Sequence, residues 1–236
     1  MTVEAVIFDL DDTLYDERKF VRSGHRAVSS YLAEKYGVDR ESCYRLLSNI
    51  FSNQGRSNVF DSALKKLNIY RKETVQEMVT VYRNHIPSIV LFREAQKLLA
   101  KLKKKCRLGL ITDGVLEVQK NKVKTLKIQH LFDVITYAVE YGGKHSVKPF
   151  LVTLKKLKVP ASESIYVDDN PLKGFSAAKK TGIRTVRILR GPNKNLRIVD
   201  EGCKPEFEIQ NLQQLFKVIC TIQKEETPKQ NVLNSS

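Results

Sequence analysis

The sequence predicts an α/β fold: a Rossmann-like open parallel sheet with helices on both faces, together with an inserted bundle of helices. Short apolar, β-branched segments alternate with amphipathic segments along most of the chain, and this alternation is typical of parallel strands buried between helices. Between residues 16 and 89 the alternation stops and only helical periodicity remains. In open sheets of this kind, ligands bind beyond the carboxyl ends of the strands, so functional side chains are expected there.

Each element of the sheet can be assigned from its own pattern. Strands are predicted at the apolar runs 3–8, 107–112, 133–139, 164–169, 184–189 and 207–210. Helices are predicted at the amphipathic segments 93–104, 115–128, 149–157, 172–182 and 211–222. Pro149 stands in the first turn of its predicted helix, a position that proline favours because no intrahelical hydrogen bond is lost there.

The inserted segment is predicted to be a helical cap over residues 16–89. Its helical stretches are 17–36, 39–53, 57–68 and 71–85, and glycines separate the first three of them. Hinges are expected near Asp16 and near Pro87–Ser88. The α/β core then comprises residues 1–15 and 90–223, and the polar segment 224–236 is expected to be frayed.

Composition narrows the class of protein. With 42% hydrophobic residues among 236, the chain can bury a substantial core, and no run of about 18 apolar residues indicates a membrane span. The first strand begins almost at residue 1, without a basic segment or a cleavage site, so a cytoplasmic location is expected. The 4 cysteines form no CxxC pair, which argues against a zinc site or a disulfide framework and for a reducing compartment.

The net charge of +15, from 41 Lys+Arg and 26 Asp+Glu, favours anionic partners. Many of the cations lie on amphipathic segments such as 97–105 and 154–158, where the charged face is usually the solvated one. The sequence has no aromatic-basic stripe of the kind that nucleic-acid binders show. A small anionic partner is therefore expected rather than nucleic acid or a membrane, and no pattern predicts the oligomeric state.

Acidic residues crowd the end of the first predicted strand, in the sequence VIFDLDDTLY. Asp9 and Asp11 are separated by one residue, so in a near-extended backbone they point the same way. Two carboxylates at this spacing repel each other unless a cation lies between them. Mg²⁺ binds a few carboxylates together with water and phosphate oxygens, and it would make the pair favourable. Asp12 and Asp16 are interpreted as turn residues.

Three further strand ends carry matching groups. Thr112 offers a hydroxyl at the end of the second strand, and the turn at Asp113 offers backbone N–H groups for a phosphate. Lys148 precedes Pro149 at the start of a helix, from where it could neutralise a phosphate or an aspartate. The fourth strand ends in two acids, Asp168 and Asp169. Four strand ends with this chemistry are difficult to explain as unrelated turns.

With these motifs the chain resembles the haloacid-dehalogenase-like (HAD) superfamily of phosphohydrolases over nearly its whole length. Asp9-Leu10-Asp11-Asp12-Thr13 matches the DxDxT signature of that family, and the helical insertion matches members with the helical type of cap. The second motif is met by Thr112, the third by Lys148 and the fourth by Asp168-Asp169.

The resemblance implies a role for each of these residues. Asp9 would be the nucleophile that forms an aspartyl-phosphate, and Asp11 the general acid and base. Asp9, the backbone carbonyl of Asp11 and Asp169 would bind Mg²⁺, with Asp168 as a further possibility. The phosphate oxygens would be held by Thr112, Lys148 and the backbone near Asp113.

The chain departs from the family pattern at Gly174, where many relatives have an aspartate, while Asp168 stands where they have a glycine. We interpret Asp168 as taking over the outer carboxylate role; reduced metal affinity, or a capping role for Asp168, is the alternative. Near the start of the cap, Tyr15 precedes Arg18, Arg22 and His25, and the last three have spacing that would place them on one helix face. That face could recognise a second anionic group or simply be solvated.

The function predicted is that of a Mg²⁺-dependent phosphatase acting on a small phosphomonoester, such as a sugar phosphate, a phosphoglycolate-like acid or a nucleotide. A phosphomutase with the same site is an alternative, and Gly174 keeps open a binding or regulatory protein with weakened catalysis. A dehalogenase is disfavoured, because that chemistry needs neither Asp11 nor a metal.

Overall fold

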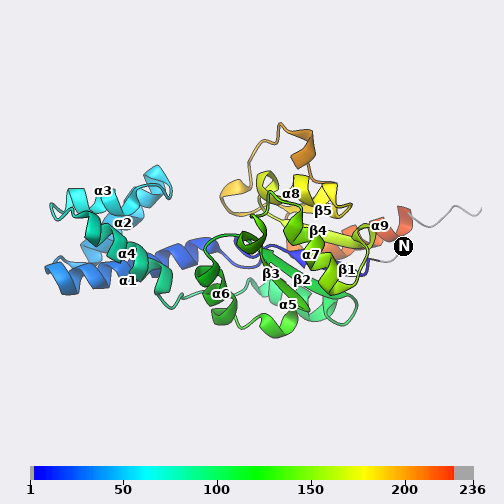
Figure 1. Ribbon diagram of the computed structural model, residues 1–236, viewed down its shortest axis with the longest axis horizontal. Coiled ribbons are helices and arrows are strands. Elements are labelled where there is room, and N and C mark those ends of the chain that lie inside the picture. Colours follow the sequence, from blue (N-terminus) through cyan, green and yellow to red (C-terminus); the bar gives the residue numbers. More distant parts are fainter. Residues whose placement is uncertain (1–2, 226–236) are drawn as a thin grey trace, which may run out of the picture. The chain divides into compact units, whose positions relative to one another are not determined.

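A six-stranded parallel sheet forms the core of the α/β part of the protein (Figure 1), as shown by a computed structural model that describes residues 3–225. The spatial order of the strands is β3-β2-β1-β4-β5-β6, and every neighbouring pair is parallel. The strands are β1 (Ala5–Phe8), β2 (Arg107–Thr112), β3 (Val134–Tyr137), β4 (Ser164–Asp168), β5 (Arg184–Ile188) and β6 (Phe207–Ile209). The open parallel sheet predicted from the sequence is therefore confirmed.

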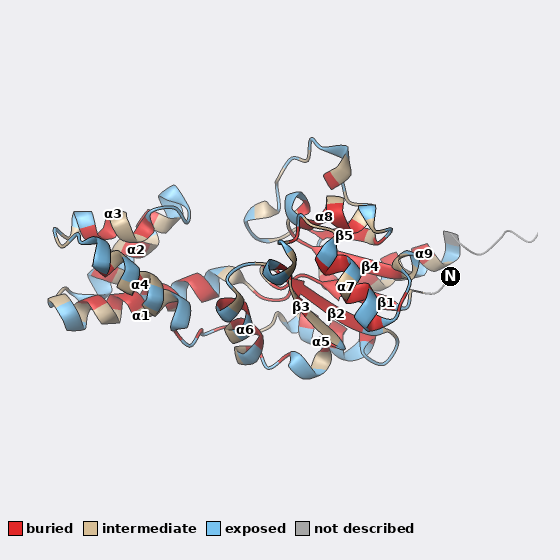
Figure 2. Ribbon diagram, viewed as in Figure 1, coloured by how far each residue is buried: buried red, intermediate tan, exposed pale blue. Residues whose placement is uncertain are grey.

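The central strand β1 is buried on both faces (Figure 2). Ala5 and Ile7 pack on one face with side chains of α7 (Lys148–Leu157) and α8 (Pro171–Lys180). Because side chains alternate along a strand, Val6 and Phe8 point to the opposite face, and they are fully buried as well. Both faces are thus covered, which explains why β1 reads as a continuous apolar run rather than an alternating one.

The remaining elements of the α/β part connect these strands. Its other helices are α5 (Arg93–Leu102) and α9 (Leu215–Glu225), and it also contains the first turn of α6 (Leu116–Thr125), up to Gln119. Short 3-10 turns occur at Gln129–Leu131, Ala138–Tyr141, Ala161–Glu163, Gly191–Asn193, Glu201–Cys203 and Leu212–Gln214. The predicted frayed segment 224–236 lies outside the described residues from residue 226 onward.

Four helices and the later part of α6 form a second compact unit, which comprises Glu17–Val90 and Lys120–Leu126. They are α1 (Glu17–Tyr36), α2 (Arg40–Gln54), α3 (Val59–Lys66) and α4 (Lys72–Asn84). Their shared core contains Leu32, Leu47 and Met78, all fully buried. Asp39 caps α2 by accepting a hydrogen bond from the backbone N–H of Ser42 over 2.9 Å, which satisfies a donor that the helix itself leaves free.

The other unit is made of the described parts of Met1–Asp16, Leu91–Gln119 and Lys127–Ser236, and it contains the whole sheet. Among the described residues, no helix combines the length and the apolar character that a membrane span requires.

Candidate active site

A buried lysine lies between two aspartates at the carboxyl edge of the sheet. Asp9 directly follows β1 and Asp168 ends β4, and because these strands pair in parallel their carboxyl ends meet. The Nζ of Lys144 donates hydrogen bonds to Oδ1 of Asp9 and, over 3.0 Å, to Oδ2 of Asp168. Asp9, Lys144 and Asp168 are 5%, 3% and 1% exposed, so water screens these charges weakly.

Lys144, and not Lys148, is the lysine of this cluster, which corrects the sequence prediction. Lys148 is the first residue of α7 and is exposed. Lys144 lies earlier, in a loop where Gly142 and Gly143 have φ angles of 87° and 81°. Glycine adopts such angles without strain, so this pair allows the tight turn that precedes Lys144. In the sequence the Gly-Gly pair marks only a turn before Lys144, and the direction in which that turn sends the lysine is seen only in the structure.

Asp169 completes a group of three buried carboxylates with Asp9 and Asp168. One oxygen of each lies within 4.8 Å of the others, a spacing at which all three can reach one cation. When every group is ionised, three carboxylates face the single ammonium of Lys144, so a net charge of −2 remains. Oxygen ligands with two surplus negative charges suit a hard divalent cation such as Mg²⁺.

The pKa values of Asp9 and Asp169 indicate that the single positive charge of Lys144 does not compensate the three carboxylates. Burial raises the pKa of Asp9 from 3.8 to about 8, with Lys144 opposing the rise and Asp168 adding to it. Burial, together with the charges of Asp168 and Asp9, raises the pKa of Asp169 to about 9. Burial lowers the pKa of Lys144, but the two aspartates outweigh burial and hold that pKa well above its usual value. A cation would supply the missing positive charge, so the residues present fit Mg²⁺.

Asp11 lies outside this group of three, and its carboxylate is held from two sides. Its Oδ1 accepts a hydrogen bond from Oη of Tyr15, and its Oδ2 accepts one from Nε2 of Gln119 over 3.0 Å. Gln119 lies on α6, and its Nε2 lies so close to Gly114 that a Cβ on Gly114 would be 2.9 Å from it. The side chain of Asp11 is thus held outside the group of three carboxylates. The metal contact predicted for Asp11 was through its backbone carbonyl, and that contact stays a prediction, as does its role in proton transfer.

Two buried hydroxyls near the same strand ends have no hydrogen-bond partner among the described residues: Oγ1 of Thr13 and Oγ1 of Thr112. Thr112 ends β2, the strand on one side of β1, and Thr13 belongs to the loop after β1. An unsatisfied buried hydroxyl costs about 1–3 kcal/mol. A ligand with several acceptor oxygens, such as a phosphate, would remove that cost, and Thr112 was predicted for this role.

Asp113 connects two of the loops at this edge. Its Oδ1 accepts a hydrogen bond from the backbone N–H of Gly114 over 3.0 Å, and its Oδ2 accepts one from the backbone N–H of Lys144 over 3.4 Å. Its carboxylate therefore fixes the loop that carries the lysine. The contact expected between backbone N–H groups near Asp113 and a phosphate stays a prediction.

Other contacts, which sequence reasoning missed, hold Asp169 of the carboxylate group and the loop after β1. The Nδ2 of Asn193 donates to Oδ2 of Asp169 over 2.8 Å. Arg190 donates to the carbonyl of Thr13 over 3.1 Å and pairs with Glu94. No short motif in the sequence marks these residues, because they come from the segment after β5, whose path is set by tertiary contacts.

Asp168 contacts Lys144, which agrees with the outer carboxylate role rather than with helix capping. The N-cap of α8 is Asn170, whose side chain accepts from the backbone N–H of Leu172 over 3.1 Å. Gly174 is buried in α8, and a Cβ there would lie 3.0 Å from the Tyr166 ring. The space that a side chain at position 174 would occupy is thus filled by the side chain of Tyr166.

The expected basic face of the first inserted helix does not form, because its members differ in exposure. Arg18 and Arg22 are exposed, whereas His25 is 3% exposed. His25 contacts the rings of Phe51 and Tyr82, with centroids 5.7 Å and 6.1 Å away. Burial lowers its pKa from 6.5 to about 4, so at neutral pH its imidazole is uncharged.

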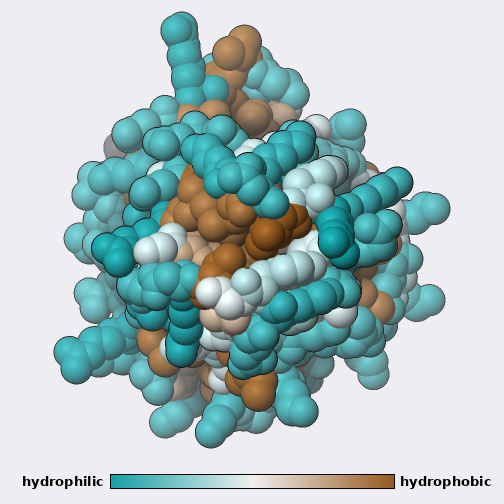
Figure 3. Space-filling model, turned by 90° about the vertical axis from the view of Figure 1, so that its left-hand side faces the viewer, coloured by the Kyte–Doolittle hydropathy of each residue, from teal (hydrophilic) through white to brown (hydrophobic). Residues whose placement is uncertain are grey.

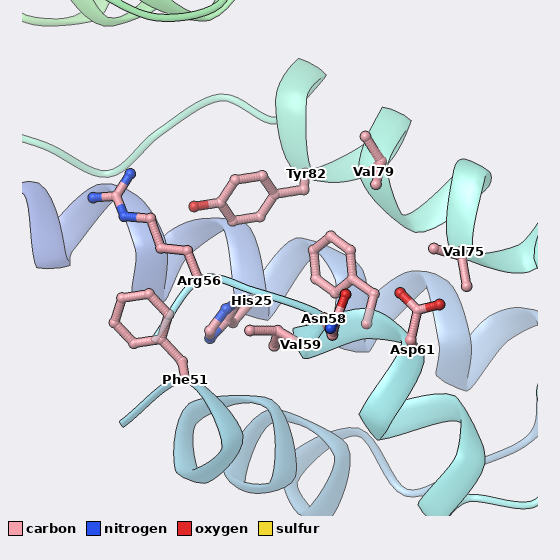
Figure 4. A pocket seen from close by; sticks show the side chains of 10 residues that line it. His25, Phe51, Arg56, Asn58, Val59, Asp61, Val75, Val79 and Tyr82 are labelled. Atoms are coloured by element: carbon pink, nitrogen blue, oxygen red, sulfur yellow. The ribbon is translucent and has the colours of Figure 1, made fainter. Parts of the chain in front are cut away.

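His25 lines a cavity of about 270 Å³ within the helical unit. Figure 4 shows its ring between Phe51 and Tyr82, with Val59, Val75 and Val79 also on the wall. Figure 3 views one face of this unit, where apolar side chains gather within a hydrophilic surface. The lining is mainly apolar, and Arg56, Asn58 and Asp61 are its polar members besides His25.

Comparison with known proteins adds independent information on the family. The profile of the haloacid dehalogenase-like hydrolase family matches residues 6–188, which include β1 to β5 and Asp9, Lys144 and Asp168. A glyceraldehyde 3-phosphate phosphatase of Methanocaldococcus jannaschii is 30% identical over 94% of this chain and 100% of its own. A protein of the same name from Pyrococcus abyssi is 31% identical over 92% of this chain and 94% of its own.

A solved structure of similar fold is a 2-haloacid dehalogenase from Pseudomonas syringae pv. Tomato. It is 27% identical, with a TM-score of 0.64, and the match covers 93% of this chain and 99% of that one. Proteins similar to this chain thus carry the names of two different activities.

Proposed function

Because the chain belongs to the haloacid dehalogenase-like hydrolases, we propose that it is a Mg²⁺-dependent phosphatase that hydrolyses a small phosphomonoester through an aspartyl-phosphate. The observation that carries this proposal is the buried cluster of Asp9, Lys144, Asp168 and Asp169 with its uncompensated charge. A site that needs a divalent cation and lies beside orphaned hydroxyls suits phosphoryl transfer.

In the first step, a carboxylate oxygen of Asp9 attacks phosphorus and the bond to the leaving oxygen breaks. The ammonium of Lys144 lies against Asp9 and would balance the negative charge that the phosphate brings into a buried site. The free hydroxyls of Thr112 and Thr13 would donate to phosphate oxygens. When bound by Asp9 and Asp169, Mg²⁺ would neutralise charge and orient the phosphate.

In both steps, Asp11 moves the proton. In its protonated form, the carboxyl group of Asp11 would first give its proton to the leaving alcohol, and the resulting carboxylate would then accept a proton from the water that hydrolyses the aspartyl-phosphate, which restores the acid. Hydrogen bonds from Tyr15 and Gln119 fix its orientation. Since proton transfer needs hydrogen-bond reach, a carboxylate held in this way is better suited to the task than a freely rotating one.

The substrate proposed is a small phosphorylated metabolite. The relatives named for glyceraldehyde 3-phosphate make that compound the first candidate, beside the sugar phosphates, phosphoglycolate-like acids and nucleotides expected from the sequence. A net charge of +15 would favour the approach of such anions.

The test is phosphate release from p-nitrophenyl phosphate and from a panel of these metabolites, with Mg²⁺ and with EDTA. Turnover that EDTA abolishes supports the proposal, and Asp9→Asn should then lose activity by a factor of about 10⁴ or more while remaining folded. Asp200→Asn is the matched control, because Asp200 is an exposed cap of a 3-10 turn.

The same preparations separate the alternatives. Isomer formation without phosphate release would indicate a phosphomutase. Chloride release from 2-chloropropionate that persists in EDTA would indicate the dehalogenase activity for which the relative of known structure is named. Failure to turn over even activated aryl phosphates would refute catalysis and favour a binding or regulatory role.

A further inference from the structure

We propose that Tyr166 is a positioning residue that holds Asp168, and through it Lys144, against Asp9, and that residue 174 is glycine because a side chain there would displace the tyrosine hydroxyl. This inference rests on the proposed function, since it assigns a further residue to the same site. Tyr166 acts through Asp168, to which its hydroxyl donates a hydrogen bond.

The hydroxyl of Tyr166 points toward Asp168 in the cluster of Asp9, Lys144, Asp168 and Asp169. Tyr166 and Asp168 are two residues apart on β4, so both point to the same face of the sheet. The Oη of Tyr166 donates a hydrogen bond to Oδ2 of Asp168 over 2.5 Å, and this hydroxyl has no other hydrogen-bond partner among the described residues. The same oxygen accepts from Lys144 over 3.0 Å.

Three donors fix the carboxylate of Asp168. Tyr166 and Lys144 share Oδ2, and the backbone N–H of Asn170 donates to Oδ1 over 2.9 Å. Rotation of the carboxylate would break at least one of these bonds, so its orientation sets the position of Lys144. Loss of the tyrosine hydroxyl would leave Oδ2 with the lysine alone and allow both groups to move away from Asp9.

The ring of Tyr166 is fixed as well. It meets Phe150 of α7 edge-to-face with centroids 5.1 Å apart, and Phe175 of α8 in the same manner at 6.0 Å. The Nζ of Lys144 lies 5.6 Å from its centroid, within the range of a cation–π interaction. The aromatic neighbours thus hold the hydroxyl where Asp168 needs it, because a fully buried ring in this packing has no room to turn.

Gly174 provides the space for this arrangement. A Cβ on Gly174 would lie 3.0 Å from Cε1 of Tyr166, 3.1 Å from its Oη and 3.4 Å from Cζ of Phe150. The two contacts with Tyr166 are short enough to require a shift of a few tenths of an ångström, whereas the contact with Phe150 is close to an ordinary van der Waals distance. Glycine within a helix is less favourable than alanine, so its presence inside α8 is explained by the approach of the tyrosine.

The ordinary explanation of a buried tyrosine is that its ring fills the core and its hydroxyl merely needs a partner. That explanation predicts a loss of stability in Tyr166→Phe without a change in catalysis. Positioning predicts that kcat falls by about 10- to 100-fold, since a small misplacement of charged groups in a site is costly, while KM stays within about twofold because the substrate contacts remain.

The experiment compares Tyr166→Phe with Tyr36→Phe in steady-state kinetics and thermal unfolding. Tyr36 is the matched control: its hydroxyl is hydrogen-bonded to Oγ1 of Thr74 over 2.6 Å in the helical unit. Both variants lose one hydroxyl, and only Tyr166→Phe should lose kcat. A kcat for Tyr166→Phe within twofold of the wild type would overturn the inference.

Gly174→Ala tests the second part of the proposal, namely that a side chain at residue 174 would displace the hydroxyl of Tyr166. It should lower kcat on its own, because the new methyl group displaces the hydroxyl, and it should cost clearly less in the Tyr166→Phe background, where that hydroxyl is already gone. Fully independent effects of the two substitutions would contradict the coupling.

A crystal structure of Tyr166→Phe gives a result that does not depend on turnover. The inference expects Lys144 to leave its position between Asp9 and Asp168, and an unchanged lysine would overturn it. If the wild type hydrolyses no phosphomonoester, the proposed function fails, whereas turnover with an unaffected Tyr166→Phe variant refutes only this inference.

Discussion

Replacement of Lys144 by methionine is the sharpest test of the site, because the chain offers Lys148 as its own control. Methionine keeps the length and apolar stem of the side chain but removes the ammonium. In the wild type this ammonium lies between Asp9 and Asp168, both almost fully buried. The substitution therefore leaves the carboxylates without their positive partner.

The expected magnitude follows from this burial. Removal of one partner from a buried ion pair typically costs about 3–5 kcal/mol, so Lys144→Met should lower the free energy of unfolding by about that amount in EDTA at pH 7. Loss of a charged donor from a catalytic site typically lowers kcat by about 10²–10³. Lys148 is exposed, so Lys148→Met should change stability by no more than about 0.5 kcal/mol and leave kcat within twofold.

The assay combines urea unfolding in EDTA with hydrolysis of p-nitrophenyl phosphate in Mg²⁺. A two-state transition allows the free energies of the three proteins to be compared directly. The reasoning is refuted if Lys148→Met loses as much activity as Lys144→Met, or if Lys144→Met is as active as the wild type.

The remaining predictions concern protonation, the cation and the helical core. In EDTA, the free energy of unfolding should fall as pH rises from about 7 to about 9, because the pKa values of Asp9 and Asp169 are raised from 3.8 to about 8 and about 9 and the folded state therefore binds more protons than the unfolded state. Below about pH 6.5 the lowered pKa of His25 acts in the opposite direction. Urea titrations at several pH values between about 7 and about 9 measure this, and a rising profile there would contradict it. Added Mg²⁺ should raise the melting temperature of the wild type and of Asp11→Asn, whose side chain lies outside the carboxylate group, but not that of Asp169→Asn. Differential scanning calorimetry measures these melting temperatures. If Mg²⁺ still raises the melting temperature of Asp169→Asn, Asp169 is excluded as a ligand. Leu47→Ala should destabilise the helical unit by about 2–5 kcal/mol because Leu47 is fully buried there; a urea midpoint equal to that of the wild type would argue against this packing.

The sequence alone locates the aspartates of the cluster at strand ends, because their positions follow from the strand pattern. Asp9 and Asp168 sit at the ends of apolar runs, and in a parallel sheet the carboxyl ends of adjacent strands meet. The strand boundaries place Asp9, Asp168 and Asp169 at one edge of the sheet, and the pairing of β1 with β4, which makes them neighbours, is seen only in the structure. Thr112 follows in the same way from the end of β2.

The lysine could not be located in this way, because it comes from a loop. Strand and helix periodicity say nothing about the path between β3 and α7, and Lys148 attracts attention through its place at the start of a helix. The position of Lys144 depends on two consecutive glycines with positive φ, whose effect on the chain is visible only in three dimensions.

The first inserted helix shows the same limit for charge patterns. Spacing predicts that His25 shares a helix face with Arg18 and Arg22, but a residue at the margin of such a face can be buried by neighbouring helices. His25 falls on that margin, packed against Phe51 and Tyr82, because the helices that cover it are distant in the sequence.

The central place of β1 in the sheet has a consequence for the biosynthesis of the protein. β1 is synthesised before both of its partners, yet Ala5 pairs with Arg107 on one side and with Ser164 on the other. While the ribosome makes the intervening residues, the nascent chain carries an apolar segment with two unpaired edges, which is prone to aggregation. The helices between Glu17 and Val90 form a compact unit of their own, so they can collapse during translation before the sheet closes around β1.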